Sequence, residues 1–195
     1  TQILESVLLN VINFESLIAT KARRLRYAAG GRKLADFGLR RAQGLAAIYA
    51  SRAAVIGGVD NTSNVLSAFL YDITTTGTQA HSWIQSFGNE LKAFRKFAEL
   101  YSNNCVLLVD TYDTLKSGIP NAIIVAKELE EKGYKLNAIR LDSGDLAYLS
   151  KKARKMLNEA ELSYVKIIAS NQLDEYLIKS LIEQGAPIDS FGVGT

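Results

Sequence analysis

The sequence has almost none of the residues that build cross-linked or metal-held folds. Its 195 residues include one cysteine, Cys105, and one histidine, His81. A single cysteine excludes a disulfide within the chain, and without Cys/His clusters we expect no zinc site. No apolar run approaches 18 residues, and no charged-then-apolar leader begins the chain. We therefore expect no membrane-spanning helix, no secretion and a cytoplasmic location.

Composition places the chain among ordinary globular domains. Hydrophobic residues make up 48% of it and charged residues 22%, with a net charge of +3. This length is enough to bury a real core, and so small a net charge predicts no nucleic-acid partner. The chain starts at Thr1 rather than methionine and stops in the glycine-rich turn 191–195. We expect it to be an internal piece of a longer polypeptide.

Hydrophobic spacing divides the chain into two kinds of pattern. The first hundred residues predict helices over 5–29, 40–56, 64–70 and 89–101, with a strand or tight loop at 34–39. Apolar strands then alternate with helices: strands at 106–109, 136–141, 165–169 and 188–191, helices at about 117–132, 145–160 and 173–184. Unbroken apolar strands separated by helices predict a parallel sheet that is covered on both faces. An open doubly wound sheet and a (β/α) barrel both fit.

Each of the four predicted strands ends in polar or glycine residues. These are Asp110–Asp113, Arg140–Asp145, Ser170-Asn171 and Gly192–Thr195. The carboxyl ends of parallel strands share one edge, where α/β proteins bind their ligands. Carboxylates there suit Mg²⁺ and ribose hydroxyls, and the serine, asparagine and glycine turns suit a phosphate. Taken singly, the same residues are also typical helix caps.

Two further segments carry chemistry. His81 follows the loop 77–80 at a predicted helix start, and an imidazole can serve as acid, base or phosphoryl acceptor. A lone histidine is also often a partly buried structural side chain. Phe37 stands close to Arg40 and Arg41, and a ring beside a cation is what a planar anion would need. Exposed arginines at a helix start are the plainer interpretation.

Together these segments resemble one enzyme family. In chain order they are Phe-Gly-Leu-Arg-Arg-Ala-Gln-Gly, Gly-Thr-Gln-Ala-His-Ser, Val-Asp-Thr-Tyr-Asp-Thr, Arg-Leu-Asp-Ser-Gly-Asp-Leu, Ala-Ser-Asn-Gln-Leu-Asp-Glu and Phe-Gly-Val-Gly-Thr. From about residue 5 to 195 the chain is similar to nicotinate phosphoribosyltransferases. The resemblance implies an irregular (β/α) barrel of the type II phosphoribosyltransferase kind. It also implies that residues 1–195 are a single catalytic barrel portion, with the N-terminal domain and the C-terminal continuation absent.

The implied reaction transfers phosphoribosyl from 5-phosphoribosyl 1-pyrophosphate to nicotinate. Its products are nicotinate mononucleotide and pyrophosphate, on a salvage route to NAD. The resemblance also implies Mg²⁺, ATP hydrolysis coupled through a phosphohistidine at His81, and a homodimer with shared sites. No nucleic acid or membrane partner is implied.

The resemblance also assigns roles to residues of this sequence. Arg140 and Phe37 match contacts to the pyridine ring, and Arg40 matches a contact to its carboxylate. Asp142 matches a ribose-hydroxyl ligand, and Asp110 an acidic residue near the metal and pyrophosphate. Further expected substrate contacts are Asp60, Ser82, Ser143 and Gly144. The expected phosphate contacts are Ser170, Asn171, Gly192, Gly194 and Thr195.

Three alternatives stay open. A nicotinamide phosphoribosyltransferase shares the histidine and the Arg-x-Asp-Ser-Gly-Asp pattern, and Asp60 could accept a hydrogen bond from an amide. A quinolinate phosphoribosyltransferase should show more Lys and Arg at the ring site. A chain cut at both ends could also bind ligand and turn nothing over.

Overall fold

The computed structural model describes residues 1–194, which form two compact units. The first unit holds Thr1–Thr76, Gln172–Ser180 and the end of the chain from Phe191. The second holds Gly77–Asn171 and Leu181–Ser190. This division does not test the prediction of a single barrel portion.

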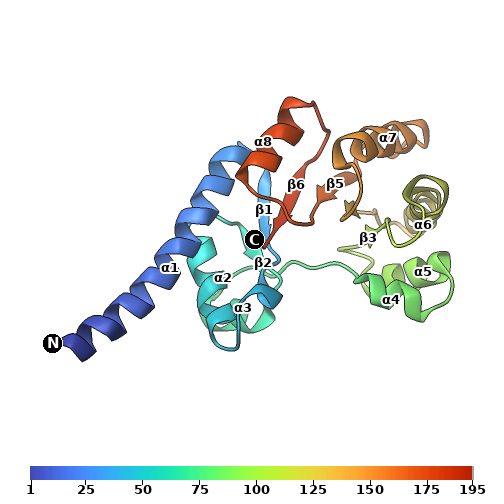
Figure 1. Ribbon diagram of the computed structural model, residues 1–195. Coiled ribbons are helices and arrows are strands. Elements are labelled where there is room, and N and C mark those ends of the chain that lie inside the picture. Colours follow the sequence, from blue (N-terminus) through green and yellow to red (C-terminus); the bar gives the residue numbers. More distant parts are fainter. Residues whose placement is uncertain (195) are drawn as a thin grey trace. The chain divides into compact units, whose positions relative to one another are not determined.

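The first unit combines three short strands with helices. Its elements are α1 (Gln2–Ala29), β1 (Lys33–Asp36), the 3-10 turn η1 (Leu39–Arg41), α2 (Ala46–Ile56), β2 (Asn61–Thr62) and α3 (Val65–Tyr71). Its strand order is β2-β1-β6, where β6 is Ser190–Val193 (Figure 1). Strands β1 and β2 are parallel, with Asp36 opposite Thr62. The carboxyl ends of β1 and β2 therefore lie side by side.

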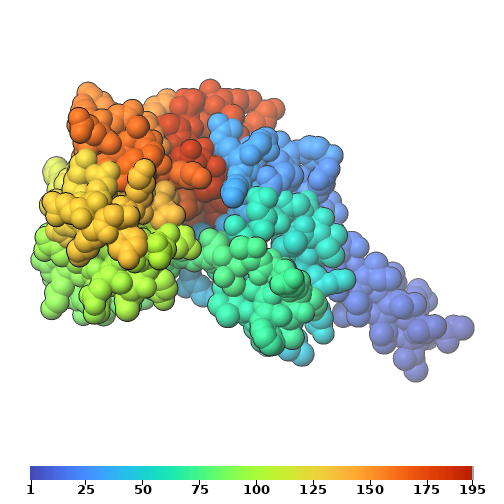
Figure 2. Space-filling view, turned by 180° about the vertical axis from the view of Figure 1, so that it is seen from behind, coloured from blue at the N-terminus to red at the C-terminus, as the bar shows by residue number. Residues whose placement is uncertain are grey.

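Helix α1 has two unlike halves. Near its C-terminal end Ala22, Leu25 and Ala29 are buried, and Gly57 at the end of α2 lies against the backbone of Ala19. The N-terminal half extends from the rest of the first unit, as the blue segment in Figure 2 shows. Its apolar side chains are exposed: Ile3, Leu4, Val7, Leu8, Leu9, Val11, Ile12 and Leu17.

By length and composition alone, α1 is apolar enough to cross a membrane, which differs from the sequence prediction. The reason is that polar but uncharged residues, such as Asn10 and Asn13, interrupt the apolar run without lowering the average hydropathy much. One such helix is weak evidence, because helices that pack inside proteins pass the same test.

The second unit holds the regular alternation of strands and helices. Its elements are α4 (His81–Ser86), α5 (Glu90–Leu100), β3 (Val106–Leu108), the π turn η2 (Thr114–Gly118), α6 (Ile119–Glu131), β4 (Ala138–Leu141), α7 (Leu146–Glu159) and β5 (Lys166–Ala169). Helix α8 (Glu175–Glu183) has residues in both units. The strand order is β5-β4-β3, and the pairs are parallel. Leu107 lies opposite Ile139, and Ile139 lies opposite Ile167. All three are fully buried, so apolar side chains form the core beneath the strand ends.

A π turn joins β3 to α6 closely. The Asp113 carboxylate accepts hydrogen bonds from the N–H groups of Leu115 and Lys116 and so begins the turn. The Gly118 N–H then donates to the Asp113 carbonyl, five residues back. A Cβ atom at Gly118 would lie 1.7 Å from the Val109 carbonyl oxygen. Only glycine therefore lets α6 begin this close to the end of β3.

The predicted parallel α/β organisation is confirmed, and the predicted strands after residue 100 all form, with ends shifted by a few residues. Strand β2 was not predicted, because two residues are too few to show an alternation. The segment 40–56 forms the turn η1 and then α2 instead of one helix. Gly44, with a φ of 54°, lies in the interruption.

Candidate active site

Three neighbouring strand ends in the second unit bring polar side chains together. Asp110 follows β3, Arg140 and Asp142 stand at the end of β4, and Ser170 follows β5. Because β3, β4 and β5 are adjacent and parallel, these residues meet at one edge of the sheet. The sequence prediction that these strand ends share an edge is confirmed.

Asp110 is the centre of this cluster, which we call the Asp110 cluster. Its side chain is fully buried. Oδ2 accepts hydrogen bonds from the Asp142 N–H and the Ser143 hydroxyl, each at 2.7 Å. Oδ1 lies 3.1 Å from His81 Nε2, and the imidazole itself is 38% exposed. A buried carboxylate thus holds the inner nitrogen of a ring whose other side reaches solvent.

Arg140 is held by hydrogen bonds to several neighbours. Its guanidinium donates to Ser170 Oγ at 2.7 Å, to Thr78 Oγ1 at 2.8 Å and to Asp142 Oδ1 at 2.7 Å. Ser170 also donates to Asp142 Oδ1. Only 16% of the Arg140 side chain is exposed. Bonds along several edges of the guanidinium fix its plane, which is the condition for stacking on a flat ring.

The loop before α4 carries His81 to this edge. Thr78 bonds Arg140, and Gln79 accepts a hydrogen bond from the Leu108 N–H of β3 at 3.0 Å. His81 is the first residue of α4, and the neighbouring Ser82 is exposed. Thr78 and Gln79 belong to the Gly-Thr-Gln-Ala-His-Ser motif, but their roles could not be predicted from sequence because their partners are distant along the chain.

Two other carboxylates at the strand ends are helix caps. Asp113 caps η2, and Asp145 accepts from the Tyr148 N–H at the start of α7. The capping alternative therefore accounts for these two, whereas Asp110 and Asp142 bond across strands. Gly144, between Ser143 and Asp145, has a φ of 76°, which suits glycine.

A second cluster lies in the first unit, around Asp36 at the end of β1. Its Oδ1 accepts from the Gly38 N–H at 2.8 Å, and its Oδ2 accepts from the Thr62 hydroxyl at 2.7 Å. The Phe37 N–H donates to the Val193 carbonyl at 2.6 Å. A Cβ atom at Gly194 would meet the backbone of Phe37 and Gly38 at about 2.9–3.0 Å. The phenylalanine loop and the glycine turn of β6 therefore pack backbone to backbone.

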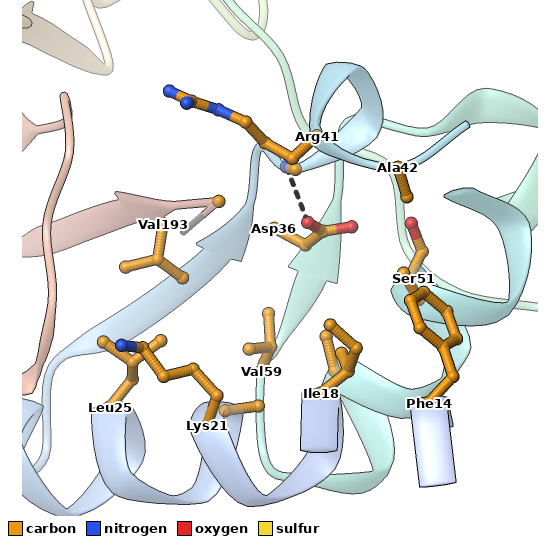
Figure 3. Close-up of a pocket in the computed structure, with 15 residues that line it drawn as sticks. Phe14, Ile18, Lys21, Leu25, Asp36, Arg41, Ala42, Ser51, Val59 and Val193 are labelled. Carbon is orange, nitrogen blue, oxygen red and sulfur yellow. Dashed lines mark hydrogen bonds between the residues drawn. The ribbon is translucent and has the colours of Figure 1, made fainter. Parts of the chain in front are cut away.

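Asp36 also lines a cavity of about 190 Å³ within the first unit. In Figure 3, Phe14, Ile18, Lys21 and Leu25 rise from α1 on one side, and Ser51 of α2 lies on another. The dashed line in that figure ends on the Asp36 carboxylate. Both carboxylate oxygens already have donors within the fold, so Asp36 supports the loop that follows β1.

Three residues of the first unit were expected to contact substrate: Arg40, Phe37 and Asp60. Arg40 is exposed on η1, and Phe37 is half-buried. Asp60 lies at the start of β2, where it pairs with Arg26 and accepts from the Leu34 N–H at 2.7 Å. It stands at the amino side of its strand, away from the carboxyl ends of β1 and β2. Asp60 therefore has a structural partner and does not join the Phe37 loop.

The expected phosphate contacts fall at two strand ends. Ser170 and Asn171 follow β5, and Asn171 has a φ of 119°, unusual for a residue with a side chain. Gly192 lies in β6 and Gly194 directly after it. Thr195 lies outside the described residues. Their roles toward a phosphate stay predictions.

The surroundings of the Asp110 carboxylate do not fit a directly bound metal ion. Its oxygens are occupied by the Asp142 N–H, the Ser143 hydroxyl and the His81 ring. Across residues 1–194, no three His, Cys, Asp or Glu side chains gather as a metal site. Thiolate chemistry has no support either, because burial raises the pKa of the Cys105 thiol to about 12.

Comparison with solved structures first identifies the fold class of this chain. The structure matches human nicotinic acid phosphoribosyltransferase with a TM-score of 0.89 and 31% identity, over 99% of this chain and 50% of that one. It matches a nicotinate-nucleotide pyrophosphorylase from Pyrococcus furiosus with a TM-score of 0.80 and 33% identity, over 93% and 46%. The fold is thus that of the type II phosphoribosyltransferases, and the predicted irregular barrel is confirmed.

The family follows from the sequence. Residues 32–195 match the nicotinate phosphoribosyltransferase (NAPRTase) family, and this chain belongs to it. The nicotinate phosphoribosyltransferase of Bacillus subtilis (strain 168) is 53% identical over 197 residues, which cover all of this chain and 39% of that relative. The chain therefore spans about two fifths of the length of that relative.

Proposed function

We propose that the protein containing this chain transfers phosphoribosyl from 5-phosphoribosyl 1-pyrophosphate to nicotinate, in the biosynthesis of NAD. The observation that supports this most is the Asp110 cluster, where the ends of β3 and β4 and the start of α4 join Arg140, Asp142, Asp110 and His81 in one hydrogen-bonded network. The family match supports the same reaction. The products would be nicotinate mononucleotide and pyrophosphate.

The chemistry asks mainly for orientation and charge stabilisation. The pyridine nitrogen attacks the anomeric carbon of the ribose as the bond to pyrophosphate breaks, so no general base is needed. Arg140, with its guanidinium plane fixed, would stack on the pyridine ring. Asp142 Oδ1 is engaged by Arg140 and Ser170, so Oδ2 is the oxygen we assign to a ribose hydroxyl. Holding both reactants in this way supplies much of the catalysis expected of such a site.

The same proposal includes ATP coupling through His81. With its Nε2 proton directed to Asp110 at 3.1 Å, the imidazole keeps its lone pair on Nδ1. Nδ1 would attack the γ-phosphorus of ATP, forming the nitrogen–phosphorus bond while the bond to ADP breaks. Water later hydrolyses the phosphohistidine and releases phosphate. The exposed side of the ring gives a nucleotide access, and Asp110 stabilises the positive charge that develops on the ring.

Magnesium enters the proposal only with the substrates. Mg²⁺ is commonly bound by substrate phosphates and water, with few protein ligands. We expect it to accompany the pyrophosphate and ATP, with no step assigned to a metal held by Asp110. A cytoplasmic location and a homodimer with shared sites belong to the same proposal.

The test is an assay of the full-length native protein with Mg²⁺ and 5-phosphoribosyl 1-pyrophosphate. Nicotinate and nicotinamide are each supplied with and without ATP. We expect mononucleotide from nicotinate, at a higher rate with ATP. Product from nicotinamide alone would reassign the substrate, and absence of product from both would contradict the proposal.

The nicotinamide alternative rests on the shared histidine, on the Arg-x-Asp-Ser-Gly-Asp pattern and on Asp60 as an acceptor for an amide. Asp60 pairs with Arg26, and the assay with nicotinamide tests this alternative directly. The quinolinate alternative is tested in the same assay. Adding quinolinate and measuring released carbon dioxide separates a quinolinate reaction from the nicotinate reaction.

A further inference from the structure

Gln79 lies in the loop that delivers His81, and it is almost entirely buried, with 3% exposed. A buried amide side chain in a loop is unusual unless it has a specific partner. Its partner is the backbone of β3: the Leu108 N–H donates to Gln79 Oε1 at 3.0 Å.

This contact satisfies an outward-facing N–H group of an edge strand. In the second unit β3 pairs with β4 on one side only, among the described residues. The Val109 N–H points to β4 and donates to the Arg140 carbonyl at 3.1 Å. Because successive N–H groups of a strand point to opposite sides, the Leu108 N–H faces away from β4. Gln79 takes the place that a neighbouring strand would fill.

The contact also fixes the loop relative to the catalytic carboxylate. Gln79 stands two residues before His81, and Leu108 stands two residues before Asp110. Two contacts with the same offset therefore join the loop to the end of β3: Gln79 to Leu108 at 3.0 Å and His81 to Asp110 at 3.1 Å. A chain joined at two such points cannot slide along the strand without breaking both.

We infer that Gln79 is a positioning residue, which sets the distance and orientation of His81 toward Asp110 by occupying the open edge of β3. The inference rests on the proposed function, because it concerns phosphorylation of His81. Gln79 acts through its oxygen: Nε2 is buried without a hydrogen-bond partner in the described part of the chain.

The test compares three variants of the full-length protein. Gln79→Met keeps the length of the side chain and removes the acceptor, and Gln79→Glu restores an acceptor. Gln85→Leu, at an exposed position of α4, is the matched control. Phosphoenzyme formation from radiolabelled ATP is measured beside the transfer reaction without ATP, and thermal unfolding checks the fold.

We expect Gln79→Met to form phosphohistidine roughly 10- to 100-fold more slowly, because small displacements of a reacting group cost that much. The ATP-independent transfer should stay within about twofold, since it does not use the imidazole. Gln79→Glu should recover most of the phosphorylation rate, and Gln85→Leu should match the native protein. A general loss of structure would lower both reactions together.

Two outcomes overturn the inference in different ways. Phosphorylation of Gln79→Met at the native rate would overturn it alone. Absence of phosphohistidine in the native protein would overturn the ATP-coupling part of the proposed function and this inference with it. If Gln79→Met does not fold, Gln79→Asn replaces it, because its amide is one methylene too short to reach Leu108, and the same slowing is expected.

Discussion

Asp36 and Asp110 are two buried carboxylates at the carboxyl ends of parallel strands, one in each unit. Among the described residues, the Asp36 carboxylate accepts from an N–H and a hydroxyl of its own unit, those of Gly38 and Thr62. Asp110 accepts from comparable groups with one oxygen but turns the other to the imidazole of His81. The difference teaches that burial at a strand end does not by itself mark a reactive group. What distinguishes Asp110 is a ring partner that is itself 38% exposed.

The largest expected effect comes from removing that partner. His81→Ala should abolish phosphoenzyme formation and ATP stimulation, because the proposed phosphoryl acceptor is the imidazole that Asp110 holds. Some ATP-independent transfer should remain, since the nucleophile there is the pyridine nitrogen. Acid-quenched phosphoenzyme and product formation are measured together. Unchanged ATP stimulation would remove His81 from the mechanism.

Asp110→Asn should lower phosphohistidine formation by about 10²- to 10⁴-fold, the range typical of a lost acid–base partner. The amide keeps the shape of the side chain but cannot stabilise a positive charge on the ring. Single-turnover phosphorylation measures the effect. Phosphorylation of a folded Asp110→Asn variant at the native rate would remove Asp110 from the mechanism.

Arg140→Ala should raise the KM for nicotinate and lower turnover. A desolvated guanidinium stacked on a ring is worth about 2 kcal/mol, so we expect kcat/KM to fall by roughly 30-fold. Steady-state kinetics at several nicotinate concentrations measure both parameters. Arg140→Lys should rescue little, because an ammonium group cannot reproduce the bonds of the guanidinium. An unaltered response to nicotinate would place Arg140 outside the site.

Asp36→Asn tests the other side of the comparison. One of its two donors would face an amide N–H₂ group, so we expect the free energy of unfolding to fall by about 1–3 kcal/mol. Phosphorylation of His81 should keep its native rate. Urea denaturation measures the first quantity and the phosphoenzyme assay the second. A large loss of phosphorylation in a folded Asp36→Asn variant would contradict the division of roles.

Cys105 lies just before β3 and belongs to neither carboxylate cluster. Its substitution should therefore have the smallest effect on the comparison. Burial raises the pKa of its thiol from 9.0 to about 12. Because the folded state holds this proton more tightly, its contribution to stability is complete below about pH 9 and declines as the pH rises toward 12. Cys105→Ala should weaken the loss of stability between those pH values. Alkylation of native Cys105 at pH 8 should be slow and should accelerate only on unfolding.

The sequence predicted the alternating half of the chain well, because each of its strands is an unbroken apolar run between helices with clear ends. It also predicted that Asp110, Arg140 and Ser170 share an edge, since parallel strands impose that geometry. It did not separate Asp113 and Asp145, which cap helices, from Asp142, which bonds across strands. That distinction depends on the orientation of each side chain.

The first unit was harder to predict for physical reasons. Strand β2 has two residues, and its existence depends on pairing with β1 rather than on its own pattern. The role of Asp60 depends on Arg26, 34 residues earlier in the chain. The support that Asp36 gives to the phenylalanine loop was missed because its partners, Gly38 and Thr62, are ordinary residues with no motif between them.

The close contact between Gly118 and the Val109 carbonyl has a genetic consequence. Every missense change that a single nucleotide can make in a glycine codon introduces a Cβ atom, and at this position that atom would fall 1.7 Å from the carbonyl oxygen. Helix α6 would then have to move away from β3 and disturb the loop that holds Asp110. Natural alleles with any other residue at position 118 should therefore be rare, and those that arise should behave as loss-of-function alleles even though the residue touches no substrate.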